Sequence, residues 1–152
     1  MGTDIHVNVL HRQKDGSYKV LNVYDENGNE ITHRMRFNNR NYALFGKLAG
    51  VRSWEDPIVE PRGLFYGLPE DLVEYYDNAD YGYHTPTWFD YAELSALART
   101  PDAVSHYNDD DDEGPGVNIL GRFISDIDFL LDMFYIWYPK PGEVIISVWF
   151  DS

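Results

Sequence analysis

The N-terminal part of the chain alternates like a β-hairpin, and this pattern limits the folds open to it. From Thr3 to His11, apolar residues occupy every second position, which is the period of a strand with one buried face. Asp15-Gly16 follows as a tight turn, because these residues accept the positive φ that hairpin turns need. Ser17–Tyr24 predicts the second strand of the pair, and Glu30–Phe37 is a candidate third strand.

Apolar residues at helical spacing predict helices further along the chain. The expected segments are Tyr42–Ala49, a short turn in Pro69–Tyr76, Trp88–Arg99 and Val117–Tyr138. Gly50 is placed to end the first of them, and Thr87 is the expected N-cap of the third. Glu143–Phe150 is rich in β-branched residues and predicts a last strand, which we expect to pair with one of the N-terminal strands.

These segments together predict one α+β domain spanning 1–152. We expect an antiparallel sheet of three to four strands, made of the N-terminal hairpin and the C-terminal strand, with helices packed on one face. The 152 residues, 43% of them hydrophobic, suit a single domain. No stretch reaches the roughly 18 apolar residues of a membrane span, so we expect a soluble, cytoplasmic protein without a membrane partner.

Charge is distributed unevenly along the chain. The net charge is −14, yet residues 1–62 hold nine Lys and Arg against eight Asp and Glu, while residues 63–152 hold three against eighteen. The acidic part repels nucleic acid, so no direct DNA or RNA binding is expected, and it suits a basic protein partner. The absence of Cys excludes disulfides and thiolate zinc sites.

Arginines are concentrated in one stretch of this acidic chain. Five lie between Arg34 and Arg62, namely Arg34, Arg36, Arg40, Arg52 and Arg62. Guanidinium groups bind phosphate or carboxylate through two parallel hydrogen bonds, so the cluster fits either an anionic ligand or internal ion pairs. For a phosphorylated ligand, Arg40, Arg52 and Arg62 would hold phosphate, Asn41 would donate from its amide, and Tyr42 would stack.

Two further groups of residues suit a ligand site. Asp4 and His6 lie two apart on the first predicted strand, so their side chains share a face. His84, Thr85 and Trp88 combine an imidazole, a hydroxyl and a large ring ahead of a predicted helix. Purely structural roles are open for both groups. The first group fits a solvent-exposed face of a strand, and the second fits closure of the core or capping of a helix.

Several motifs resemble those of a group of small uncharacterised bacteriophage and prophage proteins. They are Met1-Gly2-Thr3-Asp4-Ile5-His6, Arg40-Asn41-Tyr42 running to Phe45, Leu48 to Arg52, Arg62-Gly63, Leu68 to Asp71, and His84 to Thr87. The likeness spans most of the chain, although Leu64 to Gly67 separates the Arg-Gly and Leu-Pro elements. The resemblance implies a phage setting, in which small proteins often antagonise bacterial defence.

The function predicted from these residues is binding, without turnover, of a phosphorylated, nucleotide-like small molecule. One alternative is a metal-dependent phosphodiesterase in which Asp4, His6 and His84 hold a divalent ion. Another is an acidic protein whose C-terminal part mimics nucleic acid and blocks a basic host factor, an interaction expected to be lost when Asp109–Asp112 are neutralised. No cofactor is expected, since no nucleotide-cofactor motif occurs, and the oligomeric state stays open.

Overall fold

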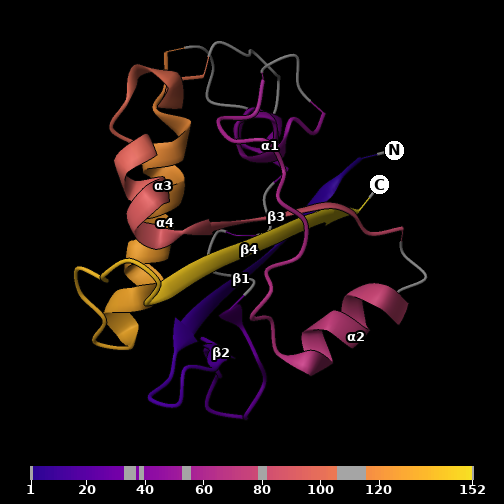
Figure 1. Ribbon diagram of the computed structural model, residues 1–152, viewed down its shortest axis with the longest axis vertical. Helices are drawn as coiled ribbons and strands as arrows, with labels where there is room; N and C mark the ends of the chain where they lie inside the picture. Colours follow the sequence, from indigo (N-terminus) through magenta and orange to yellow (C-terminus); the bar gives the residue numbers. More distant parts are fainter. Residues whose placement is uncertain are drawn as a thin grey trace.

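The computed structural model describes residues 2–32, 37, 40–52, 56–78, 82–105 and 116–151. These residues form a four-stranded antiparallel sheet, in the order β2-β1-β4-β3, with helices packed against it (Figure 1). The strands are β1 Asp4–Arg12, β2 Tyr18–Val20, β3 His84–Asp90 and β4 Val144–Asp151. The predicted α+β class with an antiparallel sheet is confirmed.

The two central strands come from opposite ends of the chain. β1 pairs with β4 along its length, from Asp4 opposite Asp151 to His11 opposite Val144. The ladder between β1 and β2 covers only Leu10 to Arg12. Within the described residues, the first half of β1 therefore has a ladder partner on one side only.

One face of the sheet carries the main core. The helices are α1 Tyr42–Ala49, α2 Glu70–Asn78, α3 Tyr91–Leu97 and α4 Ile119–Met133, with a short 3-10 helix η2 at Pro101–Ala103. Buried side chains of α1 and α4 pack with alternate residues of β1 and β4, among them Phe45, Leu130, Ile5, Val148 and Phe150. Because strand side chains alternate, the neighbours of these residues, including Asp4 and His6, lie on the opposite face.

The opposite face has a smaller core of its own. Its buried members are Leu10, Phe65, Leu68, Ile145 and Trp149, and side chains of α2 pack against them. In Figure 1, α2 lies on the side of the sheet away from α3 and α4. The structure thus adds cover on the second face to the helices expected on the first.

The predicted helix Trp88–Arg99 is wrong in its first part. Trp88, Phe89 and Asp90 belong to β3, and α3 begins at Tyr91 with the Asp90 carboxylate accepting from the Ala92 amide. Thr87 is a buried strand residue and does not cap the helix. β-Branched and aromatic residues favour a strand here, because Trp88 and Phe89 pack on opposite faces of the sheet.

The other helix predictions differ mainly at their ends. α1 matches its predicted bounds, with Asn41 capping it and Gly50 left-handed at φ 71°. α4 is shorter than the predicted Val117–Tyr138, since Tyr135 turns left-handed at φ 58° and ends it.

The predicted second and third strands are only partly present. β2 covers three residues of Ser17–Tyr24, and Glu30 makes an isolated bridge with Tyr24. Residues 33–36 of the predicted third strand lie outside the described residues. Over the described ranges, no helix combines the length and apolar character needed to cross a bilayer.

Candidate functional site

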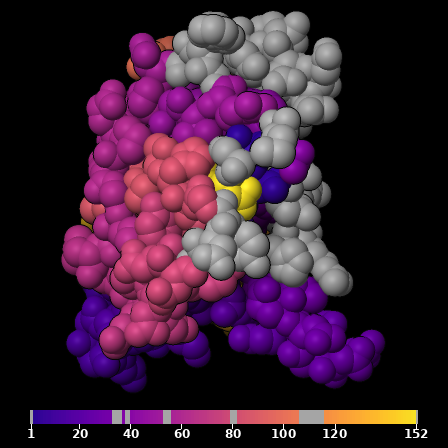
Figure 2. Space-filling model, turned by 90° about the vertical axis from the view of Figure 1, so that its right-hand side faces the viewer, coloured from indigo at the N-terminus to yellow at the C-terminus, as the bar shows by residue number. Residues whose placement is uncertain are grey.

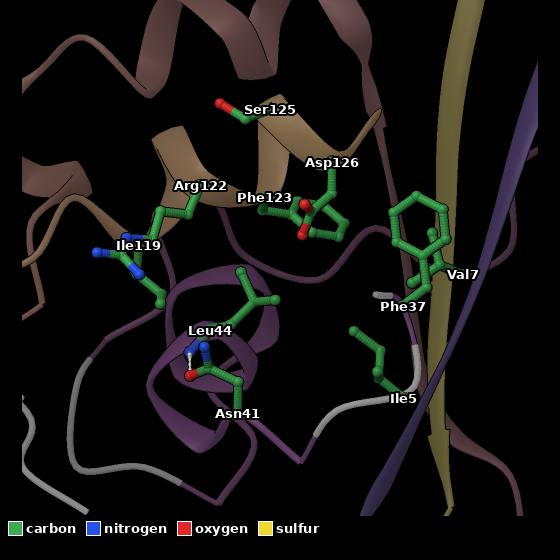
Figure 3. Close-up of a pocket in the computed structure, with 10 residues that line it drawn as sticks. All are labelled: Ile5, Val7, Phe37, Asn41, Leu44, Ile119, Arg122, Phe123, Ser125 and Asp126. Carbon is green, nitrogen blue, oxygen red and sulfur yellow. Dashed lines mark hydrogen bonds between the residues drawn. The ribbon is translucent and has the colours of Figure 1, made fainter. Parts of the chain in front are cut away.

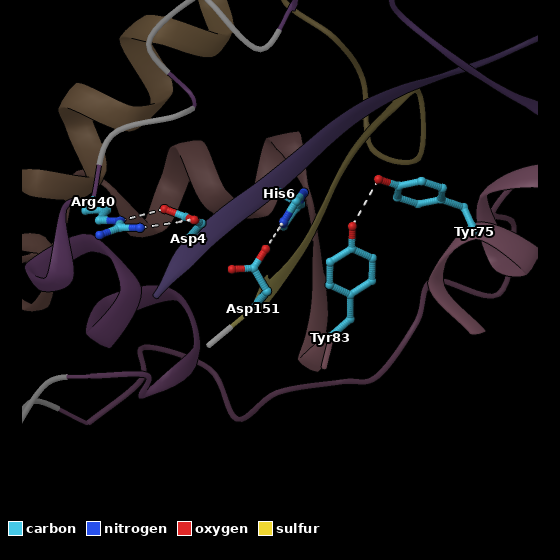
Figure 4. Close-up of polar contacts among 6 residues, drawn as sticks. All are labelled: Asp4, His6, Arg40, Tyr75, Tyr83 and Asp151. Atoms are coloured by element: carbon cyan, nitrogen blue, oxygen red, sulfur yellow. Dashed lines mark hydrogen bonds and ion pairs between the residues drawn. The ribbon is translucent and has the colours of Figure 1, made fainter. Parts of the chain in front are cut away.

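A cleft of about 570 Å³ runs along the first half of β1, and we call it the β1 cleft. Its lining includes Asp4, His6, Tyr75, Trp149 and Asp151. β1 supplies the first two, β4 the last two, and α2 the tyrosine. The cleft therefore brings residues from both ends of the chain and from α2 to one place, as Figure 4 shows for their polar contacts.

His6 is held by a carboxylate at this cleft. Its Nε2 lies 2.7 Å from Asp151 Oδ2, and both side chains are partly buried, at 31% and 23% exposed (Figure 4). An ionised carboxylate can only accept, so His6 donates through Nε2. In the neutral imidazole this leaves Nδ1 as a hydrogen-bond acceptor or base.

Aromatic rings surround His6. The Tyr83 ring lies 4.8 Å from the imidazole, and the Trp149 ring lies 6.4 Å away and nearly parallel to it. The Tyr83 hydroxyl donates to the Tyr75 hydroxyl at 3.0 Å. Tyr75 lines the cleft while remaining 52% exposed, so its ring is available to stack on a flat ligand.

Trp149 carries an unsatisfied donor. Its side chain is buried at 1% exposure, and its indole N–H has no acceptor among the described residues. A buried donor without a partner costs about 1–3 kcal/mol, so such groups are rare and call for an explanation. Trp149 also lines the β1 cleft, but its indole nitrogen is enclosed by the protein.

Asp4 and Arg40 form an exposed ion pair at the edge of the cleft. Arg40 Nε donates to Asp4 Oδ1 at 2.7 Å and Nη2 to Oδ2 at 3.4 Å (Figure 4). The hydrogen bond from Arg40, followed by its charge, lowers the pKa of the Asp4 carboxyl. Gly2 leaves the room that the guanidinium occupies, because a Cβ there would lie 2.2 Å from Arg40 Nη1.

Tyr42 and Arg52 lie at the same end of the sheet. The Tyr42 hydroxyl accepts from the Thr3 amide at 3.2 Å, and the Arg52 guanidinium lies 5.1 Å from the centre of the Tyr42 ring. Asn41 caps α1 by accepting from the Leu44 amide, so its side chain serves the helix. Figure 2 shows the beginning of β1 and the end of β4 side by side at the surface here.

His84 and Thr85 stand at an irregularity of β3. His84 pairs with Phe150, and the register then shifts before Thr87. Thr85 has a φ of 50°, which is unusual for a β-branched residue, and its hydroxyl lies 2.8 Å from His84 Nδ1. Because His84 and Ile5 both pair with Phe150, His84 projects from the core face, opposite to Asp4 and His6.

Arg62 and Trp88 lie away from this end of the sheet. Arg62 makes two 2.6 Å hydrogen bonds to Glu93, and its guanidinium stacks 4.9 Å from the Trp88 ring. Trp88 pairs with Ser147, four residues along β4 from Asp151, which is about 13 Å. The structure therefore separates these two predicted site residues from the β1 cleft and gives Arg62 an internal carboxylate.

The remaining predictions are resolved only in part. Arg34, Arg36 and Asp109–Asp112 lie outside the described residues. In the part of the chain that the structure describes, no three metal-binding side chains gather into a site. Asp4 and His6 each contact another side chain, and His84 projects from the other face, so the predicted three-ligand metal set is not assembled.

A second pocket of about 350 Å³ lies between α1 and α4 (Figure 3). Its walls are mainly core side chains such as Leu44 and Phe123, with Arg122 and Asp126 as charged members. Arg122 and Asp126 each have an interaction partner already. The β1 cleft presents more polar side chains suited to binding a ligand than this pocket does.

Tyr75, Trp149 and Asp151 are among the residues of the β1 cleft that were not predicted from the sequence. Asp151 continues the alternation of the last strand, so extending that strand by one residue would have placed it on the face of Trp149. The pairing of β4 with β1 then puts Asp151 beside Asp4, which only the strand register reveals. No local signal marks Tyr75, because its role depends on where α2 packs.

Comparisons with known proteins leave the site to be interpreted on its own geometry. No family model matches the chain, and no similar curated protein or solved structure was found.

Proposed function

We propose that this protein binds a phosphorylated, nucleotide-like small molecule in the β1 cleft and holds it without turning it over. The observation that carries the proposal is the oriented His6–Asp151 pair, which lies in a cleft that also presents the exposed ring of Tyr75. These are the groups that recognise a heterocycle: a stacking surface and a hydrogen-bonding group.

The base would lie against Tyr75. Exposed aromatic rings stack on nucleobases of every kind, and each such contact is worth about 1–3 kcal/mol. His6 Nδ1 offers an acceptor at this cleft. The His6 side chain is partly buried, so a ligand that leaves Nδ1 unpaired pays part of the desolvation cost of that atom.

The phosphate would lie at the end of the sheet, near Arg40 and Arg52. Arg40 is 51% exposed and ion pairs at exposed sites are weak, so a phosphate can compete for its guanidinium. Arg52 lies over the Tyr42 ring beside it. Arg62 has no part in this proposal, because Glu93 occupies its guanidinium.

Isothermal titration with linear and cyclic nucleotides, beside the matching nucleosides, tests the proposal. Tyr75→Ala is expected to weaken all of these ligands about tenfold, since a stacking contact is lost. Arg52→Gln is expected to weaken only those that carry phosphate. Tyr24→Ala is the matched control, because Tyr24 is also exposed, at 59%, but does not line the cleft. A folded protein that binds none of them overturns the proposal.

Hydrolysis is the second candidate, favoured by the His6–Asp151 pair. A histidine fixed through one ring nitrogen by a carboxylate is arranged to act as a general base through the other. Product analysis separates the two functions, since a sequestering protein returns its nucleotide intact. If turnover is found, His6→Asn must abolish it.

The biological setting belongs to the proposal as well. The motifs that resemble phage proteins support a role in the bacterial cytoplasm, where sequestering a nucleotide signal would counter a defence pathway.

A further inference from the structure

A group of exposed side chains at the C-terminal end of α4 has no role in the β1 cleft. It consists of Phe129, Asp132, Met133, Tyr135 and Trp137, and we call it the α4 patch. Its apolar members are 65%, 47%, 79% and 60% exposed, in chain order. Phe129, Asp132 and Met133 are spaced three and four apart, so they share one face of the helix. In Figure 1 this end of α4 leads into the loop before β4, away from α2.

The rings of the patch are held in place before any partner arrives. Trp137 Nε1 donates to Asp132 Oδ1 at 2.6 Å, which ties the indole to the helix. The Tyr135 ring meets the Trp137 ring edge-on, with centroids 5.8 Å apart. Exposed and preorganised Trp and Tyr rings are the commonest anchors of protein interfaces, because little conformational entropy is lost when they are buried.

The backbone at Tyr135 is unusual for a tyrosine. The Ile136 amide bonds to the Leu131 carbonyl and the Tyr135 amide to the Asp132 carbonyl, which is the Schellman ending of a helix. The left-handed residue of that motif is most often glycine, whereas here it is Tyr135 at φ 58°. Helix termination alone would favour glycine at this position, so the side chain of Tyr135 serves another purpose.

The segment that carries the rings is acidic. Residues 126–138 contain three aspartates and no Lys, Arg or His. The last turn of α4 also lacks a basic residue, so the negative end of the helix dipole is not compensated there. A cation placed over Trp137 or Tyr135 would gain from the ring faces, from Asp132 and from the dipole together.

We infer that the α4 patch docks a basic, amphipathic segment of another protein, whose Arg or Lys side chains meet Asp132 and the rings while its apolar side chains cover Phe129 and Met133. A second copy of this chain fits poorly, since two such patches would bring like charges together. Nucleic acid and anionic lipid are repelled for the same reason. The inference is independent of the ligand in the β1 cleft.

Titration with a short amphipathic peptide of Arg and Leu, followed by NMR of amide and indole signals, tests the inference. Signals of 129–137 are expected to shift, and added salt is expected to weaken the complex. Trp137→Ala is expected to weaken binding at least about tenfold, as for interface anchors. Asp132→Asn keeps an acceptor for the indole but removes the charge, so a loss of about threefold and a weaker salt dependence are expected.

Controls make the test specific to the patch. Tyr66→Ala removes a ring that is 84% exposed elsewhere and must leave binding unchanged. Tyr135→Gly removes a patch ring without straining the backbone, so weaker binding by a fully folded variant supports the inference. The inference is overturned if no peptide binds, if a Glu and Leu peptide binds equally well, or if Trp137→Ala has no effect. It is also overturned if neutralising Asp109–Asp112 abolishes binding, or if sedimentation shows a dimer that depends on Trp137.

Discussion

The ion pair between Asp4 and Arg40 depends on Gly2, which leaves room for the guanidinium. Gly2 packs so closely against Arg40 that any side chain there would overlap the guanidinium. Arg40 in turn lowers the pKa of Asp4 from its ordinary value of 3.8. Because the folded-state pKa is the lower one, the pair stabilises the fold above pH 3.8, and that contribution is lost as the pH falls through the folded-state pKa.

Gly2→Ala is therefore expected to raise the pKa of Asp4 toward 3.8. Since only the end of a flexible side chain must move, the free energy of unfolding should change by less than about 0.5 kcal/mol. NMR titration of side-chain carboxyl carbons measures the change. Arg40→Gln must give the same rise, while Asp15, whose pKa is lowered by Ser17, keeps its value. An unchanged Asp4 in either variant contradicts the contact.

Tyr135→Gly is expected to stabilise the protein. A left-handed conformation costs a residue with a Cβ roughly 1–2 kcal/mol, and glycine avoids this cost. The ring that is lost is 79% exposed and contributes little burial. Denaturant unfolding should show a gain of about 1 kcal/mol. A loss of that size would mean that the Tyr135 ring supports the fold.

At the scale of elements, α3 and α4 are joined by a hydrogen bond between side chains. The Tyr91 hydroxyl donates to Asp128, and burial, followed by this bond, raises the pKa of Tyr91 to about 12. Between pH 10 and 12 the unfolded chain loses the phenol proton before the folded chain does, so stability should fall across this range.

Asp128→Asn is expected to lower the pKa of Tyr91 but to leave it above its ordinary value of 10, because burial remains the larger cause. NMR of the tyrosine ring carbons follows this titration. A Tyr91 pKa that does not change on substitution would show that Asp128 has no part in it.

Neighbouring residues of α4 should respond very differently to truncation. Leu130 is fully buried, so Leu130→Ala is expected to cost about 2–5 kcal/mol of unfolding free energy. Phe129, adjacent in sequence but 65% exposed, should cost less than about 0.5 kcal/mol when changed to Ala. Denaturant unfolding of the two variants compares them directly, and equal losses would contradict the orientation of the helix.

The elements that the sequence predicted well are those whose ends carry local signals. α1 begins at an asparagine cap and ends at a left-handed glycine, and both are visible in the sequence. α4 was predicted too long because its apolar period continues past Met133 while the backbone turns at a tyrosine. Trp88–Asp90 was assigned to a helix because its strand partner, β4, lies far away in the chain.

The candidate site also combines residues that local sequence patterns reveal with residues that they do not. Asp4 and His6 could be selected from strand alternation alone, whereas their partners Arg40 and Asp151 lie 36 and 145 residues away. Nothing local distinguishes Arg40, which pairs with Asp4, from Arg62, which pairs with Glu93. Partner choice depends on how strands and helices pack, and sequence patterns do not contain that information.

For the molecule as a whole, the site depends on the pairing of the two central strands, β1 and β4. β1 begins at Asp4 and β4 ends at Asp151, so the β1 cleft exists only once the two ends of the chain have paired. Such long-range pairing forms slowly and cooperatively. Binding of a ligand should therefore stabilise the entire fold, because it favours only the folded state.

The account rests on a nucleotide occupying the β1 cleft, which Trp149 and His6 line, and indole NMR tests this directly. The four indole signals are followed while linear and cyclic nucleotides are added, and Trp149→Phe identifies the relevant one. We predict that a nucleotide that binds shifts the Trp149 signal in proportion to occupancy and shifts His6 with it. Saturation by a nucleotide that leaves both signals in place would contradict the account.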